Sequence, residues 1–451
     1  MKKLVFFLAV LITELSIAQS TVNFKSLRYD EDYSTLSLDS NATFYSKMKN
    51  TSLDKNHNFS LSIGGELRNQ YQFFKNENWG DAPEDNNGFL LNRALLHTDL
   101  KFKNKLRLFT QLQSSTAISR ITPNAVEKNE LDIHQLFLDY YFINSVEKLT
   151  LRLGRQEVLF GSQRLVSVRE GPNSRRAFDG AKLMFNSNTS TLSAFYLHEV
   201  NNVPDVFNDK ITSNHKLFGT YNQFKKINYV QNIDLYYLGT YNKKAVFSNG
   251  IGIENRSTIG TRIWNTSSKW SYDFEAVYQF GKINGQQISA YTLSSNTSFA
   301  TNKTKFGFKT EVISGDLKKE DNRLNTFNPL FPRGAYFGLA ALIGPENLID
   351  AHPYLEYEIT DRIVLGLDYD MFWRYSKYDG IYGANVKPIF DVSTSDQRNI
   401  GTQLGLNFEF QVNPFLNLTL EGNWFNTGKY IKEVSTGKDI YFTAFTMQYK
   451  F

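Results

Sequence analysis

The stretch Trp270-Ser-Tyr-Asp-Phe-Glu-Ala-Val-Tyr-Gln-Phe280 alternates bulky apolar residues with polar ones. Because successive side chains of a β-strand point to opposite faces, this order places one face in apolar surroundings and the other in water. Similar alternation recurs in segments 303–312, 398–411 and 413–426. A tilted strand needs roughly 9–11 residues to cross the hydrocarbon of a bilayer, and each segment is about that long. The pattern therefore predicts membrane-crossing strands.

Eighteen segments of this kind follow one another along the chain. They span residues 58–75, 89–102, 105–117, 130–144, 149–157, 177–187, 190–199, 214–225, 230–241, 253–265, 269–281, 285–296, 303–312, 351–360, 362–375, 398–411, 413–426 and 439–451. Single-chain bacterial barrels have an even number of antiparallel strands. We therefore predict an all-β fold, a porin-like transmembrane antiparallel β-barrel of about 18 strands.

The connections between these segments alternate in length. Connections 76–88, 118–129 and 158–176 are long, whereas those between them are short. Outer-membrane barrels have short periplasmic turns and long outer loops, and a soluble sandwich has no reason to sort its loops in this way. One outer connection, 281–284, is expected to be short.

The composition supports the same class. Aromatic residues make up 15% of the chain, with 37 Phe and 25 Tyr, yet the mean hydropathy is −0.40. Strands with one face in lipid, bordered by aromatic girdles, have this balance. There is no cysteine, which excludes disulfides and thiolate metal sites.

The ends of the chain indicate export to the outer membrane. Residues 1–18 have the charged start, apolar stretch and small-residue end of a signal peptide. Its removal lowers the formal charge from +5 to +4, a balance that argues against a nucleic-acid partner. We expect a partly disordered periplasmic lead-in at 19–57 and a single barrel domain at 58–451, in contact with lipid and lipopolysaccharide. The last strand ends in Phe451, which resembles the signal read by the barrel assembly machinery.

The densest charge lies between residues 152 and 176, where six of twenty-five residues are arginine. Arginine captures carboxylates in a bidentate geometry that lysine cannot offer. The run 151–180 also carries a Gly-Arg-Gln, Gly, Arg-Leu, Asn, Arg and Phe-Asp-Gly series in this order. In this series, and in segments 131–139, 327–338 and 344–348, the chain resembles the alginate export family.

The resemblance covers about residues 60–451 and implies an eighteen-stranded barrel. Its arginine-lined lumen, narrowed by an infolded loop, would conduct a polyuronate. Strand parity independently places several charges in the lumen, Arg68, Arg107 and Arg262 among them. Arg155 has the opposite parity, so it lies beyond the hydrocarbon band, behind a bulge, or turned inward with the loop. The candidate pore and substrate residues are Arg68, Arg107, Arg152, Arg155, Arg164, Arg169, Arg175, Arg176, Asp179 and Arg262.

Inward acids give a second interpretation of the same charges. Parity makes the first third of the barrel basic inside and the rest acidic, which would produce a transverse field in the pore. Alternatively, lumen arginines and carboxylates pair to hold the loop 158–176 inside. The two roles are compatible.

An enzyme is not predicted. The six histidines show no metal-ligand spacing, and no Gly-x-Ser-x-Gly motif is present. The pairs Glu356/Glu358 and Asp368/Asp370 could bind a cation, but we interpret them as solvated lumen acids. A hydrolase with His134 as its base is a remote alternative. No cofactor, catalytic residue or metal site is predicted.

The sequence thus predicts a monomeric outer-membrane channel for an anionic polysaccharide such as alginate. The alternatives are a porin for the uptake of small anions or sugars, and a non-conducting surface receptor or scaffold barrel.

Overall fold

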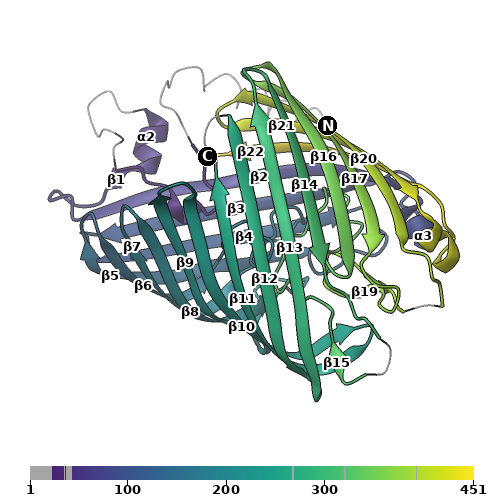
Figure 1. The fold of residues 1–451 in the computed structure, drawn as a ribbon. Coiled ribbons are helices and arrows are strands. Elements are labelled where there is room, and N and C mark those ends of the chain that lie inside the picture. The colour runs from purple at the N-terminus through teal and green to yellow at the C-terminus, as the bar shows by residue number, and fades with distance from the viewer. Residues whose placement is uncertain (1–22, 35, 37–42, 267–268, 319–320, 393) are drawn as a thin grey trace.

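A closed barrel dominates the computed structural model, which describes residues 23–34, 36, 43–266, 269–318, 321–392 and 394–451. Within these ranges eighteen long antiparallel strands form one sheet (Figure 1). They are β2 (Phe59–Lys75), β3 (Phe89–Phe102), β4 (Leu106–Ile118), β5 (Asn129–Asn144), β6 (Lys148–Gln156), β7 (Phe178–Asn186), β8 (Ser190–Asn201), β9 (Lys210–Ile227), β10 (Gln231–Phe247), β11 (Gly250–Asn265), β12 (Trp270–Ile283), β13 (Gln286–Ala300), β14 (Thr304–Ile313), β16 (Leu348–Thr360), β17 (Ile363–Arg374), β20 (Asn399–Asn413), β21 (Leu416–Thr427) and β22 (Ile440–Lys450). The predicted all-β barrel of 18 strands is confirmed, and the predicted signal peptide lies outside the described residues.

The barrel closes between its first and last long strands. Each strand pairs with the next in the chain, and β2 pairs with β22 from Glu66↔Lys450 to Lys75↔Tyr441. Closure leaves no strand edge with unpaired N–H and C=O groups, which could not find water in the hydrocarbon.

Short helices and strands lie at the two ends of the barrel. They are η1 (Arg28–Asp30), α2 (Phe44–Lys49), β1 (Thr51–Ser52), η2 (Glu77–Gly80), β15 (Arg323–Leu324), β18 (Ile381–Tyr382), β19 (Pro388–Phe390) and α3 (Lys429–Val434). The C-terminus and α2 lie at the end with the short turns, here called the inner end (Figure 1). The opposite, outer end carries α3, β15 and β19. None of the helices in the described ranges is long and apolar enough to cross a membrane.

The two faces of the strands differ as the alternation predicts. Leu67 is 46% exposed on the outside of β2, whereas the next residue, Arg68, is 4% exposed inside. On β6 the corresponding values are 47% for Leu153 and 3% for Arg152. An apolar band thus surrounds a polar interior, as in membrane barrels.

One expectation about the connections is wrong. β10 and β11 remain paired as far as Phe247↔Gly250, so residues 248–249 form a second short outer connection besides 284–285. The register shifts between Asn242 and Ala245. This irregularity interrupts the alternation on which the predicted strand ends depended.

The outer turn between β12 and β13 has a local cause. Asn284 and Gly285 have φ angles of 44° and 92°, and an Asn-Gly pair with two positive φ values is the preferred two-residue turn between twisted antiparallel strands. The predicted short connection is confirmed.

Loops fill much of the interior. A large buried apolar cluster joins wall residues such as Phe178 and Leu238 to the loop residues Val158, Val166 and Phe331. On β3 even the inward face is apolar in part, since Phe89, Leu91 and Leu95 are at most 3% exposed. The interior beside β3 is therefore not uniformly polar.

The fold predicts which connections face the medium. In a chain without cysteine, single Asn385→Cys and Asp361→Cys variants each carry one thiol. Residue 385 lies in the long outer connection 375–398 and residue 361 in the short turn 361–362. A membrane-impermeant maleimide added to intact cells should label the first variant and leave the second unlabelled until the cells are lysed. The reverse labelling would contradict this topology.

Candidate functional site

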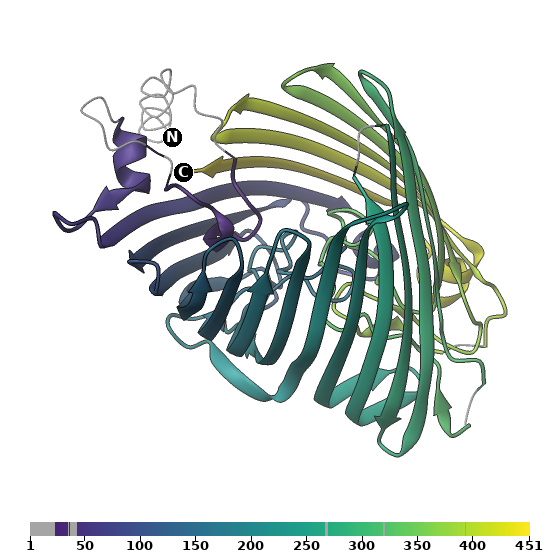
Figure 2. The same ribbon diagram turned by 60° about the vertical axis from the view of Figure 1, so that its left-hand side comes forward.

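The connection 157–177 between β6 and β7, here called the lumen loop, folds into the barrel. Its residues Val158, Val166 and Val168 are at most 1% exposed. Figure 2 shows irregular segments lying inside the wall of strands. The infolded loop that the family resemblance implies is thus present.

A second outer connection, 314–347, meets the lumen loop inside the barrel. Val166 and Phe331 form an isolated β-bridge. The amide of Ser167 donates to the carbonyl of Phe331 at 2.9 Å. The amide of Phe331 donates in turn to the carbonyl of Leu165 at 2.8 Å. The two segments therefore form one unit across the lumen.

The wall near β2 holds the lumen loop through hydrogen bonds. Arg68 donates to the carbonyls of Glu170 and Pro172, both at 2.9 Å. The side-chain amide of Asn173, which is fully buried, donates to the carbonyls of Asn92, Thr116 and Glu127 at 3.1, 3.1 and 2.9 Å. Arg68 is therefore an anchor of the loop.

Two loop arginines are locked by carboxylates. Arg175 pairs with Glu157 and Glu170, both within the same loop. Arg164 reaches the opposite wall, where it pairs with Glu311 at 2.7 Å and Glu275 at 3.0 Å. Burial lowers the pKa of Arg175, but Glu157 and Glu170 outweigh it and raise that pKa above its usual range.

The wall arginines are paired too. Arg107 binds Asp99 at 2.7 Å, and Arg152 binds Asp139 at 2.7 Å. On the other side Arg262 pairs with Asp273 at 2.8 Å and with Asp234 at 3.1 Å. The arginines of the first third therefore have acids of the same region beside them, and the expected basic and acidic walls stay a prediction.

Two of the candidate residues lie apart from this network. Arg155 pairs with Asp179 at 3.0 Å across β6 and β7, and it also donates to the carbonyl of Ile133 at 3.0 Å. It has the same parity as the outward Leu153, close to the outer end of β6. Arg155 and Asp179 thus join neighbouring strands.

Residues 23–34, here called the N-terminal segment, lie in the inner mouth of the barrel (Figure 2). Tyr29 is 4% exposed, and its hydroxyl donates to the carbonyl of Glu157 in the lumen loop at 2.8 Å. The guanidinium of Arg152 lies 3.9 Å from the centre of its ring, a cation–π contact. Arg28 donates to the carbonyls of Gly65 and Phe451 at 2.8 and 2.9 Å. The segment joins the barrel seam to the lumen loop.

At the outer end a cavity of about 540 Å³ remains between the loops and the wall. Its charged lining includes Glu77, Arg120, Glu127, Arg169, Arg176, Glu199, Lys244 and Lys387. Arg120 is neutralised by Glu77 and Asp85 at 2.7 and 2.5 Å.

Arg169 and Arg176 are poorly compensated. Arg169 forms no ion pair with any carboxylate in the described ranges, and its Nε atom donates to the carbonyl of Ser174. Arg176 has one acid, Glu199, at 3.4 Å, and that acid also binds His215 at 2.8 Å. Burial and the neighbouring Arg176 lower the pKa of Arg169 to about 9, and burial lowers the pKa of Arg176. A guanidinium stays charged at neutral pH, so this pair presents positive charge to the cavity.

Sequence reasoning missed three members of the network. Arg93 is 1% exposed and pairs with Glu66 and Glu170, and Glu157 and Glu170 hold Arg175. Arg93 lies between Leu91 and Leu95 on the inward face of β3. Because its inward neighbours are apolar, the alternation does not identify this face as the lumen side. The two glutamates lie within the arginine-rich run, and their negative charge is the signal that could have identified them as partners of the arginines.

The whole-chain comparison decides the family. A family model described as alginate export matches residues 59–441. The chain belongs to the alginate export family. It is an outer-membrane β-barrel with the architecture of a channel, and a comparison with curated proteins found no match.

Solved outer-membrane channels share the fold of this alginate export barrel. Pseudomonas aeruginosa OccD3 (OpdP) is 10% identical with a TM-score of 0.60, covering 90% of this chain and 93% of its own. P. aeruginosa OccK2 (OpdF) in complex with glucuronate is 10% identical with a TM-score of 0.57, covering 86% and 97%. P. aeruginosa OpdK with vanillate is 9% identical with a TM-score of 0.56, covering 87% and 98%. At this identity the likeness shows the fold alone.

The pairing predicts that Arg152 and Arg175 hold the structure together. An Arg152→Gln/Arg175→Gln variant removes the bidentate partners of the buried Asp139 and Glu157, which keep only Arg107 at 3.7 Å and His134 at 2.8 Å. Breaking one buried pair costs about 3–5 kcal/mol. We expect a lower melting temperature and noisy gating in planar bilayers, with little change in ion selectivity. The exposed Arg323→Gln is the control. A large selectivity change with unaltered melting would contradict the anchoring role.

The N-terminal segment gives a second prediction. Tyr29→Ala removes the ring under Arg152 and the hydrogen bond to Glu157, whereas Tyr29→Phe removes the hydrogen bond alone. Truncating a buried aromatic side chain costs about 3–5 kcal/mol, and losing the hydrogen bond costs about 1 kcal/mol. We expect faster tryptic cleavage after Lys25 and a larger single-channel conductance for Tyr29→Ala only. Equal cleavage and conductance in all three proteins would show that the segment does not depend on this contact.

Proposed function

We propose that this protein passes an acidic polysaccharide of the alginate type, a polyuronate, across the outer membrane. Arg169 and Arg176, at the floor of the outer cavity, receive its carboxylates. The observation that carries the proposal is the incomplete compensation of these two arginines, Arg176 buried and Arg169 half-buried, which both line the cavity.

The chemistry of the pair fits such a solute. A uronate carries one carboxylate on each sugar ring, and a guanidinium binds a carboxylate through two parallel hydrogen bonds. Arg169 has a φ of 59°, a conformation uncommon outside glycine, asparagine and aspartate, so its placement has a conformational cost. Of the other loop arginines, Arg164 already holds three acids and Arg175 two, so both are less able to bind a further carboxylate.

The comparisons support the same class of solute. The family is described as alginate export, and alginate is a polyuronate. Two channels of similar fold are described with glucuronate and with vanillate, which are both carboxylates. A carboxylate-binding lumen is therefore compatible with this architecture.

A second candidate is the uptake of small acidic sugars. The packed interior favours it, because the lumen loop and the connection 314–347 leave an outer cavity of about 540 Å³. A monomeric uronate needs less free space inside the barrel than a polymer chain does. Comparing block by glucuronate with block by uronate oligomers of increasing length separates the two candidates, since only a polymer channel gains affinity with length.

The test of the carboxylate site is an Arg169→Gln/Arg176→Gln variant in planar bilayers. A hydrogen bond to a charged group contributes about 1.5–3 kcal/mol, so losing the pair should weaken block by a uronate oligomer at least about tenfold. The effect should shrink at high salt, because screening weakens the charge attraction.

The matched control is Lys244→Gln/Lys387→Gln, which removes the same charge from exposed positions of the same cavity. If block depends only on the net charge of the cavity, both double variants lose affinity equally. Unchanged block in the arginine variant would remove Arg169 and Arg176 from the transport hypothesis.

A further inference from the structure

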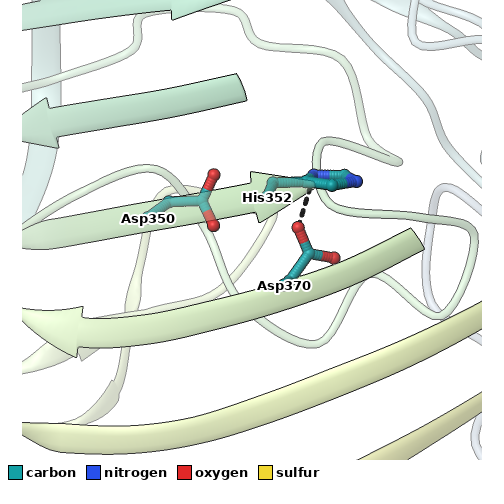
Figure 3. Close-up of side chains that lie close together, drawn as sticks. All are labelled: Asp350, His352 and Asp370. Carbon is teal, nitrogen blue, oxygen red and sulfur yellow. Dashed lines mark ion pairs between the residues drawn. The ribbon is translucent and has the colours of Figure 1, made fainter. Parts of the chain in front are cut away.

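Three potential metal ligands meet on the inner face of the wall, on the strand that follows the connection 314–347 and on its neighbour β17. Asp350 and His352 extend from β16, and Asp370 extends from β17 (Figure 3). One ligand atom from each residue lies within 4.8 Å of the other two, and Nδ1 of His352 is 2.5 Å from Oδ1 of Asp370. The three residues come from two adjacent strands, so their backbone positions are fixed by the barrel.

These atoms are buried and incompletely satisfied. Asp350 is 1% exposed, Asp370 is 0% exposed and His352 is 8% exposed. Oδ1 of Asp350 and Nε2 of His352 have no hydrogen-bond partner, whereas Oδ1 of Asp370 contacts Nδ1 of His352. A buried carboxylate oxygen without a donor is costly, and a cation is one way to remove that cost.

The surrounding charges leave the cluster acidic. Asp368 lies 3.8 Å from His352 and adds a further carboxylate. Across β14, Glu311 stands opposite Asp350 and Lys309 opposite His352. Glu311 is held by Arg164, and the ammonium of Lys309 lies 4.8 Å from the ring centre of Tyr354. In the described part of the chain Lys309 forms no ion pair with Asp350, Asp368 or Asp370. The only basic side chain there within 4.0 Å of these three carboxylates is His352.

We propose that Asp350, His352 and Asp370 form a binding site for a divalent transition-metal ion, with Zn²⁺ as its probe. Two carboxylates and an imidazole suit such an ion, whereas Ca²⁺ prefers six to eight oxygen ligands. Ligand atoms about 2.1 Å from a tetrahedral Zn²⁺ lie about 3.4 Å apart. The three ligand atoms, now within 4.8 Å of one another, therefore close on the ion by side-chain rotations of roughly an ångström.

The ion would join β16 to β17 beneath the connection 314–347. The side-chain amide of Gln403 donates both to Asp370 and to the carbonyl of Phe337 in that connection, at 3.2 and 2.9 Å. Metal binding would therefore hold the Asp370 carboxylate in place, and with it the Gln403 amide that joins Asp370 to Phe337. It also removes negative charge from the wall, independently of which solute the channel carries.

The experiment uses the purified full-length barrel in detergent, stripped with a chelator and then titrated with Zn²⁺ or Co²⁺. The chain has no cysteine, so thiolates do not compete. We expect one ion per chain, a Co²⁺ absorption spectrum with nitrogen and oxygen ligation, and a melting temperature that rises with Zn²⁺ concentration. His352→Ala and the isosteric Asp350→Asn should each weaken binding by about 100-fold or more, since even a partner outside the coordination shell contributes 10–100-fold.

The control is Glu358→Gln, which removes an exposed inward acid from the same strand and should bind Zn²⁺ as the natural chain does. Heat-modifiable migration on gels verifies that each variant is folded. Absence of stoichiometric binding in the natural chain would overturn the proposal, as would equal binding by Asp350→Asn. Binding of Ca²⁺ as tight as that of Zn²⁺ would also contradict it, because it would leave His352 without a role.

Discussion

The closure of β2 on β22 is the constraint on which the rest of the structure depends. In hydrocarbon every backbone N–H and C=O needs a partner within the protein, and a closed sheet meets that demand without a free edge. Closure of eighteen strands, however, encloses more space than wall side chains alone occupy. The outer connections 157–177 and 314–347 therefore enter the barrel, and their apolar residues form its largest buried cluster.

Bringing loops into a charged interior requires that the charges be matched. Arg164 holds three carboxylates and Arg175 two. The wall residues Arg107 and Arg152 each bind an acid on a neighbouring strand. Such pairs fix geometry well but leave little attraction for a passing anion. The proposed solute site therefore lies where the matching is incomplete, at Arg169 and Arg176.

The sequence predicts the strands well because alternation is a local property. Leu153 outside and Arg152 inside follow from parity alone, and the strand count follows from eighteen repeats of that pattern. The prediction failed where local order is broken, as at the bulge near Asn242, which concealed the continuation of β10 and β11. Pairing partners were harder still to predict. Glu170 meets Arg93 across seventy-seven positions of sequence, and the site at Asp350 and Asp370 depends on the register of two strands.

The segment around Tyr29 has a mechanical consequence. It runs from the barrel mouth to the lumen loop as one short piece of chain, bound to Phe451 at one point and to Glu157 at another. A pull on this segment would be transmitted to Glu157, and from there to the ion pair of Arg175. The mouth of the barrel and the lumen loop are thus coupled by tension along one short segment of chain.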